Sequence, residues 1–201
     1  ATTADWVELD AAAAIAWLRA RFPGDEIIGI AHSIGGLALA ASPNAAQQDL
    51  LAFIAPHTAY VGDYHWRYRL PMALLWHAAM PAATRIAGYF PARRLGLGED
   101  LPAGVALEWA RRRSPQLRPR GDQPAAQRIN RLLDGAANLE RPALALTIRD
   151  DAFATAAGAR RLLAYFPGLR VRHLELTPAQ ANVRSLGHFG FFRREAGRRL
   201  W

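Results

Sequence analysis

Four residues of this 201-residue sequence could together attack a carbonyl carbon: Ser33, Asp150, Asp151 and His188. A serine hydroxyl is a weak nucleophile until a neighbouring base takes its proton. Histidine is the usual base, and a carboxylate fixes the tautomer of its ring and stabilises the imidazolium. The residue types therefore predict a Ser33–His188 pair oriented by one of the two adjacent aspartates, and either aspartate can fill that place.

Ser33 lies between an apolar run, 27–31, and a segment that favours a helix from Gly35 onward. The five residues from Ala31 to Gly35 follow the Gly-x-Ser-x-Gly pattern of a strained strand–turn–helix, with Ala in the first position. Such a turn holds the hydroxyl clear of the backbone and points N–H groups at it. Ile34 is the residue expected to offer its backbone N–H to a developing oxyanion. The alternative interpretation is a glycine-rich turn in which the serine is incidental.

The elements that would position these residues alternate between strands and helices. We expect strands over 26–31, 50–55, 143–148 and 169–174, and helices over 10–22, 35–41, 156–165 and the C-terminal residues. This alternation favours an α/β fold with a mostly parallel sheet and helices on both faces. Side chains that follow the strands of such a sheet meet at its carboxyl edge. The serine, the aspartates and the histidine each follow a strand, so they are expected to converge there.

The stretch 56–140 differs from the rest, with several tryptophans, many prolines and apolar residues at helical spacing. We expect 1–55 and 141–201 to form the α/β core and 56–140 to form a helical cap insertion, with a loop over 114–124 and a helix over 127–133. Residues beside the strand ends and in the cap are candidates for a substrate pocket: His32, His57, Tyr60 and Trp66. The alternatives are a packing role for His32 and a purely structural role for the cap aromatics.

Composition excludes several classes of protein. Apolar residues make up 51% of the chain and charged residues 21%, which is typical of a globular domain. The absence of cysteine excludes disulfides and thiolate zinc sites, and no other metal-ligand spacing occurs, so we expect no metal and no cofactor. No apolar run of about 18 residues suggests a membrane span, and residues 1–6 do not look like a signal peptide. These features favour a cytoplasmic protein.

The formal net charge is +8, and every basic residue is arginine. Arginines cluster over 111–120 and 193–199, which would suit nucleic acid or an anionic membrane. No nucleic-acid-binding motif accompanies them, so solvated helix faces are the favoured interpretation and no nucleic-acid partner is expected. Among the acidic residues, Asp63 is expected in a loop with no evident partner.

The motifs resemble those of the C-terminal two-thirds of a bacterial α/β-hydrolase, in a group of predicted serine hydrolases. The similar stretches are 5–22, 31–36, 88–91 together with 94–100, 150–151 and 187–192. The resemblance implies Ser33 as nucleophile, His188 as base and Asp151 or Asp150 as acid, with Asp151 favoured by its spacing to the following helix. It also implies esterase-like activity on an ester, thioester or amide of a small acyl substrate.

The chain departs from this family at its start. The family has about four strands before the serine strand, and a loop among them supplies one of two oxyanion N–H donors. Here only one helix precedes the serine strand, so the second donor has no evident source and the strand is expected to be an open apolar edge. Such edges invite pairing. We therefore expect a homodimer or a complementing N-terminal segment, and the alternative function is a truncated or non-catalytic module that binds a partner through this edge.

Overall fold

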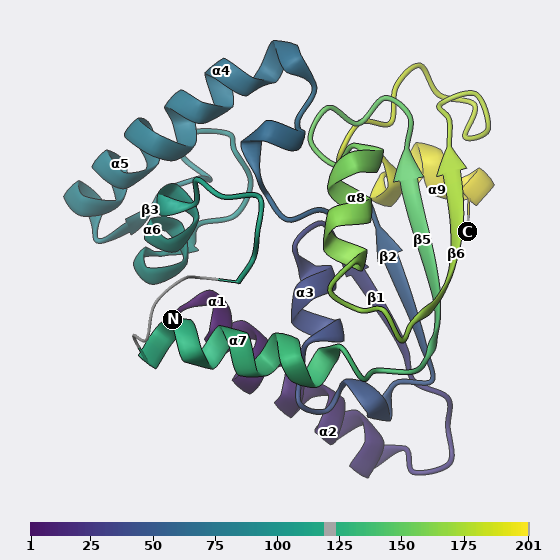
Figure 1. The fold of residues 1–201 in the computed structure, drawn as a ribbon. Helices are drawn as coiled ribbons and strands as arrows, with labels where there is room; N and C mark the ends of the chain where they lie inside the picture. The colour runs from purple at the N-terminus through teal and green to yellow at the C-terminus, as the bar shows by residue number, and fades with distance from the viewer. Residues whose placement is uncertain (119–123, 201) are drawn as a thin grey trace.

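A computed structural model gives the fold, and it describes residues 1–118 and 124–200. Four strands form the main sheet in the order β1 (Ile28–His32), β2 (Leu50–Ile54), β5 (Pro142–Ile148), β6 (Arg170–Leu176). Every neighbouring pair is parallel, so all four carboxyl ends lie at one edge (Figure 1). The strands form where the chain is richest in apolar residues, and Leu51 and Phe53 are completely buried. The predicted parallel α/β sheet is confirmed.

The helix before β1 begins earlier than the predicted residue 10. It runs through α1 (Thr3–Asp5), the π-helical turn η1 (Trp6–Ala11) and α2 (Ala12–Arg21) without a break in helical backbone. Its start is a capping box, in which the Thr2 hydroxyl accepts the Asp5 N–H and the Asp5 carboxylate accepts the Thr2 N–H. This reciprocal pair satisfies helix N–H groups that would otherwise lack partners.

Helices cover the two faces of the sheet unequally. On one face lie α3 (Gly35–Ala40), α7 (Pro124–Ala136) and α8 (Ala156–Leu163), and Val7 of η1 joins their core cluster. On the other face lies α9 (Arg194–Leu200), near the carboxyl ends of the strands (Figure 1). On β1, which is an edge strand, Ile28 and Ile30 are 54% and 62% exposed. The expected open apolar edge is therefore present.

The insertion contains a packing cluster of its own. It comprises α4 (Trp66–Leu74), the π turn η4 (Leu75–Ala79), α5 (Met80–Ala87), α6 (Ala103–Arg111) and the two-stranded antiparallel pair β3 (Tyr89–Phe90) and β4 (Leu101–Pro102). Trp76, Met80 and Phe90 are buried at its centre. The short β3–β4 pair was not among the elements predicted for this helical insertion. Helix α7 also falls within 56–140, but its Leu133 packs in the main core with β2.

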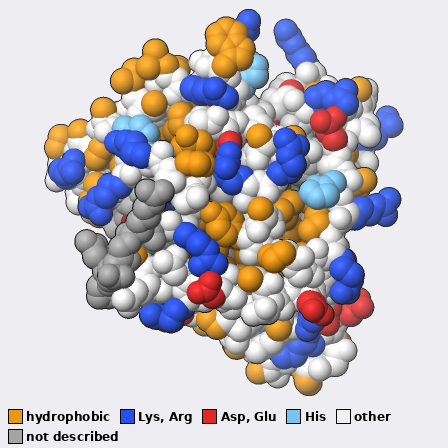
Figure 2. All heavy atoms as spheres, viewed as in Figure 1, with side chains coloured by type: hydrophobic (Ala, Val, Ile, Leu, Met, Phe, Trp, Pro, Cys, Tyr) orange, Lys and Arg blue, Asp and Glu red, His pale blue; other side chains and the backbone are white. Residues whose placement is uncertain are grey.

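Short 3-10 turns complete the fold: η2 (Ala45–Gln47), η3 (Val61–Asp63) and η5 (Gly190–Phe192). Of the loop expected over 114–124, residues 119–123 lie outside the described residues. No helix within the described part of the chain is both long enough and apolar enough to cross a membrane. On the face drawn in Figure 2 the basic side chains are scattered among neutral and apolar ones and form no continuous patch.

Candidate active site

Ser33 follows β1 directly and has left-handed backbone geometry, with φ at 59°. This region is unfavourable for residues other than glycine, so neighbouring structure must hold the turn. The Ser33 N–H donates to the Ile54 carbonyl at 2.9 Å, which ties the turn to β2. Helix α3 then starts at once, and a Cβ added at Gly36 would lie 2.8 Å from the Phe53 ring. The small residue lets the helix pack against the sheet directly behind the serine.

Ser33, His188 and Asp151 are joined by hydrogen bonds. His188 Nε2 lies 3.1 Å from Ser33 Oγ, and His188 Nδ1 lies 2.7 Å from Asp151 Oδ2. An ionised carboxylate only accepts, so Nδ1 carries the ring proton and Nε2 presents its lone pair to the serine hydroxyl. The His188 and Asp151 side chains are 7% and 0% exposed. The arrangement can remove the serine proton and stabilise the resulting imidazolium.

The Asp151 carboxylate is kept ionised by its neighbours. Burial acts to raise the pKa of Asp151, but the hydrogen bond from His188 and its electrostatic attraction act the other way. Backbone N–H groups of Phe153 and Ala154 donate to Oδ1 at 2.8 and 2.9 Å. These donors prevail, and the pKa of Asp151 lies below its ordinary value.

The neighbouring Asp150 does not bond to His188 but holds the loop that carries it. Its carboxylate accepts from the Ser185 hydroxyl at 2.8 Å and from the N–H groups of Leu186 and Gly187 at 3.0 and 3.1 Å. Gly187, at φ 54°, takes the left-handed turn just before the histidine. Of the two aspartates left open by residue type, Asp151 is the one that reaches the ring.

A second imidazole, His57, also contacts Ser33. Its Nε2 lies 2.8 Å from Ser33 Oγ, and the side chain is buried. Burial, and next the proximity of His188, lower the pKa of His57 to about 3. From sequence, His57 was a candidate for lining a pocket, and a direct contact with the serine was not foreseen. The available signal was its position three residues after the end of β2, the strand next to β1.

The other three candidate pocket residues lie differently. His32 Nε2 lies 2.8 Å from the His188 carbonyl, and its ring centroid is 4.6 Å from that of His188. Burial lowers the pKa of His32, so its ring packs as a neutral group. Tyr60 lies under the Arg161 guanidinium, and Trp66 is 67% exposed beside His65. In the described structure neither Tyr60 nor Trp66 has a hydrogen bond or ring contact with Ser33 or His188.

The expected oxyanion donor, Ile34, occupies the N-cap position of α3. Within the described residues its backbone N–H donates to no protein acceptor. It therefore stands next to Ser33 with its donor available to a ligand. The Ser33 N–H cannot serve in the same way, because it is engaged with Ile54.

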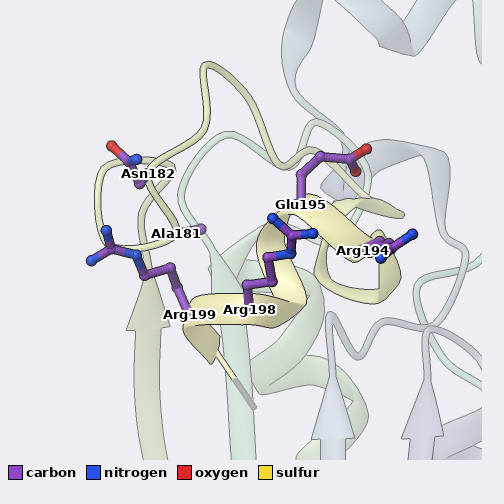
Figure 3. A pocket seen from close by; sticks show the side chains of 6 residues that line it. All are labelled: Ala181, Asn182, Arg194, Glu195, Arg198 and Arg199. Carbon is purple, nitrogen blue, oxygen red and sulfur yellow. The ribbon is translucent and has the colours of Figure 1, made fainter.

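A surface hollow lies elsewhere, at α9 (Figure 3). Its lining residues are Ala181, Asn182, Arg194, Glu195, Arg198 and Arg199. None of them belongs to the Ser33 cluster, so the candidate site is defined by its hydrogen-bonded residues and not by this hollow. No group of three histidines or carboxylates suited to holding a metal ion occurs in the described residues.

No family model and no curated protein matches the chain. Solved structures that resemble it include a monoacylglycerol lipase from Paleococcus ferrophilus, at 14% identity and a TM-score of 0.49, and the esterase domain of a Rhodothermus marinus protein, at 16% identity and 0.46. Each alignment covers 94% of this chain, and it spans 70% and 62% of those two structures. Identities and TM-scores this low do not establish an activity. An activity for this chain has to be inferred from the residues of the site.

Proposed function

We propose that this chain is a serine hydrolase that cleaves an ester, thioester or amide bond of a small acyl substrate. Ser33 is the nucleophile, His188 the general base and Asp151 the carboxylate that orients His188. The observation that carries the proposal is the hydrogen-bonded path from Asp151 Oδ2 to His188 at 2.7 Å and on to Ser33 Oγ at 3.1 Å. The resemblance of the sequence to α/β-hydrolases supports the same roles.

The proposed reaction has two stages. Ser33 Oγ forms a bond to the carbonyl carbon while His188 Nε2 takes the hydroxyl proton, and the carbonyl oxygen becomes an oxyanion beside the Ile34 N–H. His188 then gives its proton to the leaving group as the scissile bond breaks. In the second stage water attacks the acyl-serine, again with His188 as base, and Ser33 is released with its proton restored.

The surroundings of His188 favour an apolar acyl group. The rings of Phe153 and Phe189 have centroids 5.8 and 4.9 Å from that of His188, and Tyr64 packs against Phe153 at 5.4 Å. We infer that the cap helices bound the acyl pocket from the same side. Hydrolysis of p-nitrophenyl esters of graded chain length tests this, because a pocket gives an optimum and a flat profile contradicts it.

A fluorophosphonate probe tests the proposed nucleophile. The wild-type chain should be labelled, Ser33→Ala should not, and Asp151→Asn should label far more slowly. Ser42→Ala is the matched control, because Ser42 is another buried serine outside the site and its loss should leave labelling intact. A folded wild-type chain that takes up no label would contradict the proposal.

The exposed β1 edge favours a second candidate function, a hydrolase-like module that binds a partner or a second copy through this strand. Ile28 and Ile30 give the edge an apolar character. Sedimentation of Ile30→Lys tests this, with Leu174→Lys on the opposite edge strand as control. Self-association that is lost only in Ile30→Lys supports the edge as the interface, and a monomeric wild-type chain contradicts homodimer formation.

A further inference from the structure

His57 approaches the serine oxygen as closely as the proposed base does. The two imidazole Nε2 atoms lie 2.8 Å (His57) and 3.1 Å (His188) from Ser33 Oγ. The ring centroids of the two histidines are 5.2 Å apart, at 83°. A hydroxyl has one proton and two lone pairs, so the two rings must play different parts: one accepts the proton and the other donates to the oxygen.

The partners of the two Nδ1 atoms determine which ring donates to Ser33 Oγ and which ring accepts its proton. The Ala59 N–H donates to His57 Nδ1 at 3.0 Å, so this nitrogen presents its lone pair. A neutral ring then carries its proton on Nε2, which faces Ser33. In His188 the order is reversed, because Nδ1 donates to Asp151. His57 is therefore the donor to Ser33 Oγ, and His188 is the acceptor of its proton.

His57 keeps this state at working pH. A second proton would have to occupy Nδ1, which already faces the Ala59 N–H. The side chain is buried, and burial and then the nearby His188 ring oppose a positive charge on it. The ring is thus a fixed neutral donor, unlike a histidine that gains and loses a proton during turnover.

The backbone around His57 is held in an unusual shape that fixes this aim. Ala55 and Ala59 have φ values of 48° and 57°, in the left-handed region that favours glycine. Such geometry in other residues persists only where the surroundings enforce it, and it is frequent at functional sites. Here the Ala55 N–H donates to Leu146 O at 2.8 Å, and the partly buried guanidinium of Arg112 donates to the Thr58 carbonyl.

Helix α8 packs closely against the Cβ of His57. A Cβ added at Gly158 would lie 3.1 Å from His57 Cβ, which is tighter than most real contacts. His57 is therefore enclosed by α8 on one side and by its own strained loop on the other. The orientation of the ring itself is fixed by the Ala59 N–H on Nδ1 and by the contact of Nε2 with Ser33.

From these observations we propose that His57 is a further catalytic residue, which donates its Nε2–H to Ser33 Oγ at rest and to the substrate oxyanion in the tetrahedral intermediate. The proposal rests on the serine hydrolase function proposed above. After attack, Oγ and the oxyanion are bonded to the same carbon, and Oγ has become an ester-type oxygen that accepts hydrogen bonds poorly. The donor then interacts best with the new negative charge.

His57 would thus act beside Ile34, whose N–H is the other available donor. Donors that are already oriented stabilise an oxyanion without reorganisation. No covalent change or proton transfer occurs at His57. In deacylation the same N–H stabilises Oγ as the acyl–oxygen bond breaks and His188 returns the proton. One fixed donor therefore serves both stages.

Rates of fluorophosphonate labelling test the proposal through two substitutions. His57→Leu removes the donor, and labelling should slow by about 100- to 1,000-fold, as for the loss of one oxyanion donor. His57→Gln keeps an N–H near the same position and should recover most of the rate. His173→Leu, on an exposed position of β6, is the control and should label at the wild-type rate. The pH profile of labelling should keep its midpoint in His57→Gln, because His57 is not the titrating base.

Several outcomes would overturn the proposal. If folded His57→Leu is labelled at the wild-type rate, His57 has no catalytic role, while the roles of Ser33 and His188 stand. Labelling in His57→Gln as slow as in His57→Leu would also overturn it. A chain that never labels would overturn both proposals together. Imidazole ¹⁵N shifts give an independent readout even if His57→Leu does not fold: they should show the Nε2–H tautomer of His57 from pH 5 to 8, and the other tautomer would contradict the proposal.

Discussion

Asp150 and Asp151 are adjacent in the chain and bind two parts of the same loop. Asp151 accepts from the His188 ring at 2.7 Å, while Asp150 accepts from the Ser185 hydroxyl at 2.8 Å and from two backbone N–H groups beyond it. One carboxylate therefore orients the imidazole, and the other fixes the backbone that carries it. The two should respond differently to the same substitution.

Asp151→Asn should reduce turnover of a p-nitrophenyl ester by about 10⁴-fold. The amide N–H would donate to Nδ1 of His188 and so favour the tautomer whose proton is on Nε2, which cannot accept the serine proton. Asp150→Asn retains one acceptor oxygen for the loop, so its loss should be far smaller and should appear mainly as reduced stability. Steady-state kinetics and urea unfolding of both variants measure this. The roles assigned here are wrong if Asp150→Asn is the more damaging change to turnover.

The left-handed backbone of Ser33 predicts an effect on stability that is independent of activity. Ser33→Gly and Ser33→Ala both remove the hydroxyl, but only glycine adopts φ 59° without strain. The free energy of unfolding of Ser33→Gly should exceed that of Ser33→Ala by about 1 kcal/mol. Ala38→Gly in the middle of α3 is the control and should be destabilising by about 1 kcal/mol. Equal stability of the two Ser33 variants would show that the turn is not strained.

Sequence patterns were sufficient for the sheet and for the convergence of Ser33 and His188. Apolar runs bounded by small or polar residues identify buried parallel strands, and parallel order brings their carboxyl ends together. Strand ends moved by only one or two residues, as from 50–55 to Leu50–Ile54. Sequence patterns could not decide whether Asp150 or Asp151 bonds to His188. The two residues are adjacent and of the same type, and only the local turn of the backbone determines which carboxylate faces the ring.

The donor role of His57 could not be read from the sequence for a physical reason. It depends on the tautomer, which follows from the Ala59 N–H, and that N–H is aimed by an alanine at φ 57°. Alanine normally avoids this conformation, so an alanine in the sequence does not predict a left-handed turn. The pair β3–β4 was missed because two-residue strands are too short to show alternation. The Thr2–Asp5 capping box marks the true helix start, and the prediction of a helix from residue 10 missed this signal in the sequence.

Stability should fall with acid because of His57. Its pKa is lowered from 6.5 to about 3, so below pH 6.5 the unfolded chain binds a proton that the folded site excludes. The free energy of unfolding should therefore rise with pH, by up to about 1.4 kcal/mol per unit between these two values. The ring is faced by His188, Asp151, His32 and Arg112, of which His32 also has a lowered pKa and adds in the same direction.

Urea unfolding of wild type and His57→Gln between pH 5.0 and 7.5 isolates this contribution, because the two proteins share all their other titratable groups. Any stability advantage of wild type over His57→Gln should shrink as the pH falls. His32→Gln provides the comparison for the second lowered histidine. A stability difference between wild type and His57→Gln that does not change with pH would contradict a neutral, buried His57.

Asp63 was expected in a loop without a partner, and this was wrong. Its carboxylate accepts from Arg161 Nε at 2.7 Å and from Arg161 Nη2 at 2.9 Å, while the Thr155 hydroxyl donates to its carbonyl at 2.6 Å. The Asp63 side chain is 7% exposed. These contacts join η3, just after the His57 loop, to α8. Nothing in the sequence indicated the pair, because the two partners are 98 positions apart in the chain.

A double-mutant cycle of Asp63→Asn and Arg161→Gln should give a coupling of about 1–3 kcal/mol, because the bonds are charge-assisted, bidentate and largely shielded on the carboxylate side. The same cycle on the exposed pair of Arg149 and Glu175 should give at most about 1 kcal/mol and should vanish in 1 M salt. Asp63→Asn should also slow fluorophosphonate labelling more than Glu175→Gln does, since η3 continues from the loop that aims His57. Equal coupling energies in the two pairs would mean that the Asp63 contact is an ordinary surface ion pair. Equal labelling rates in Asp63→Asn and Glu175→Gln would mean that the contact does not affect the site.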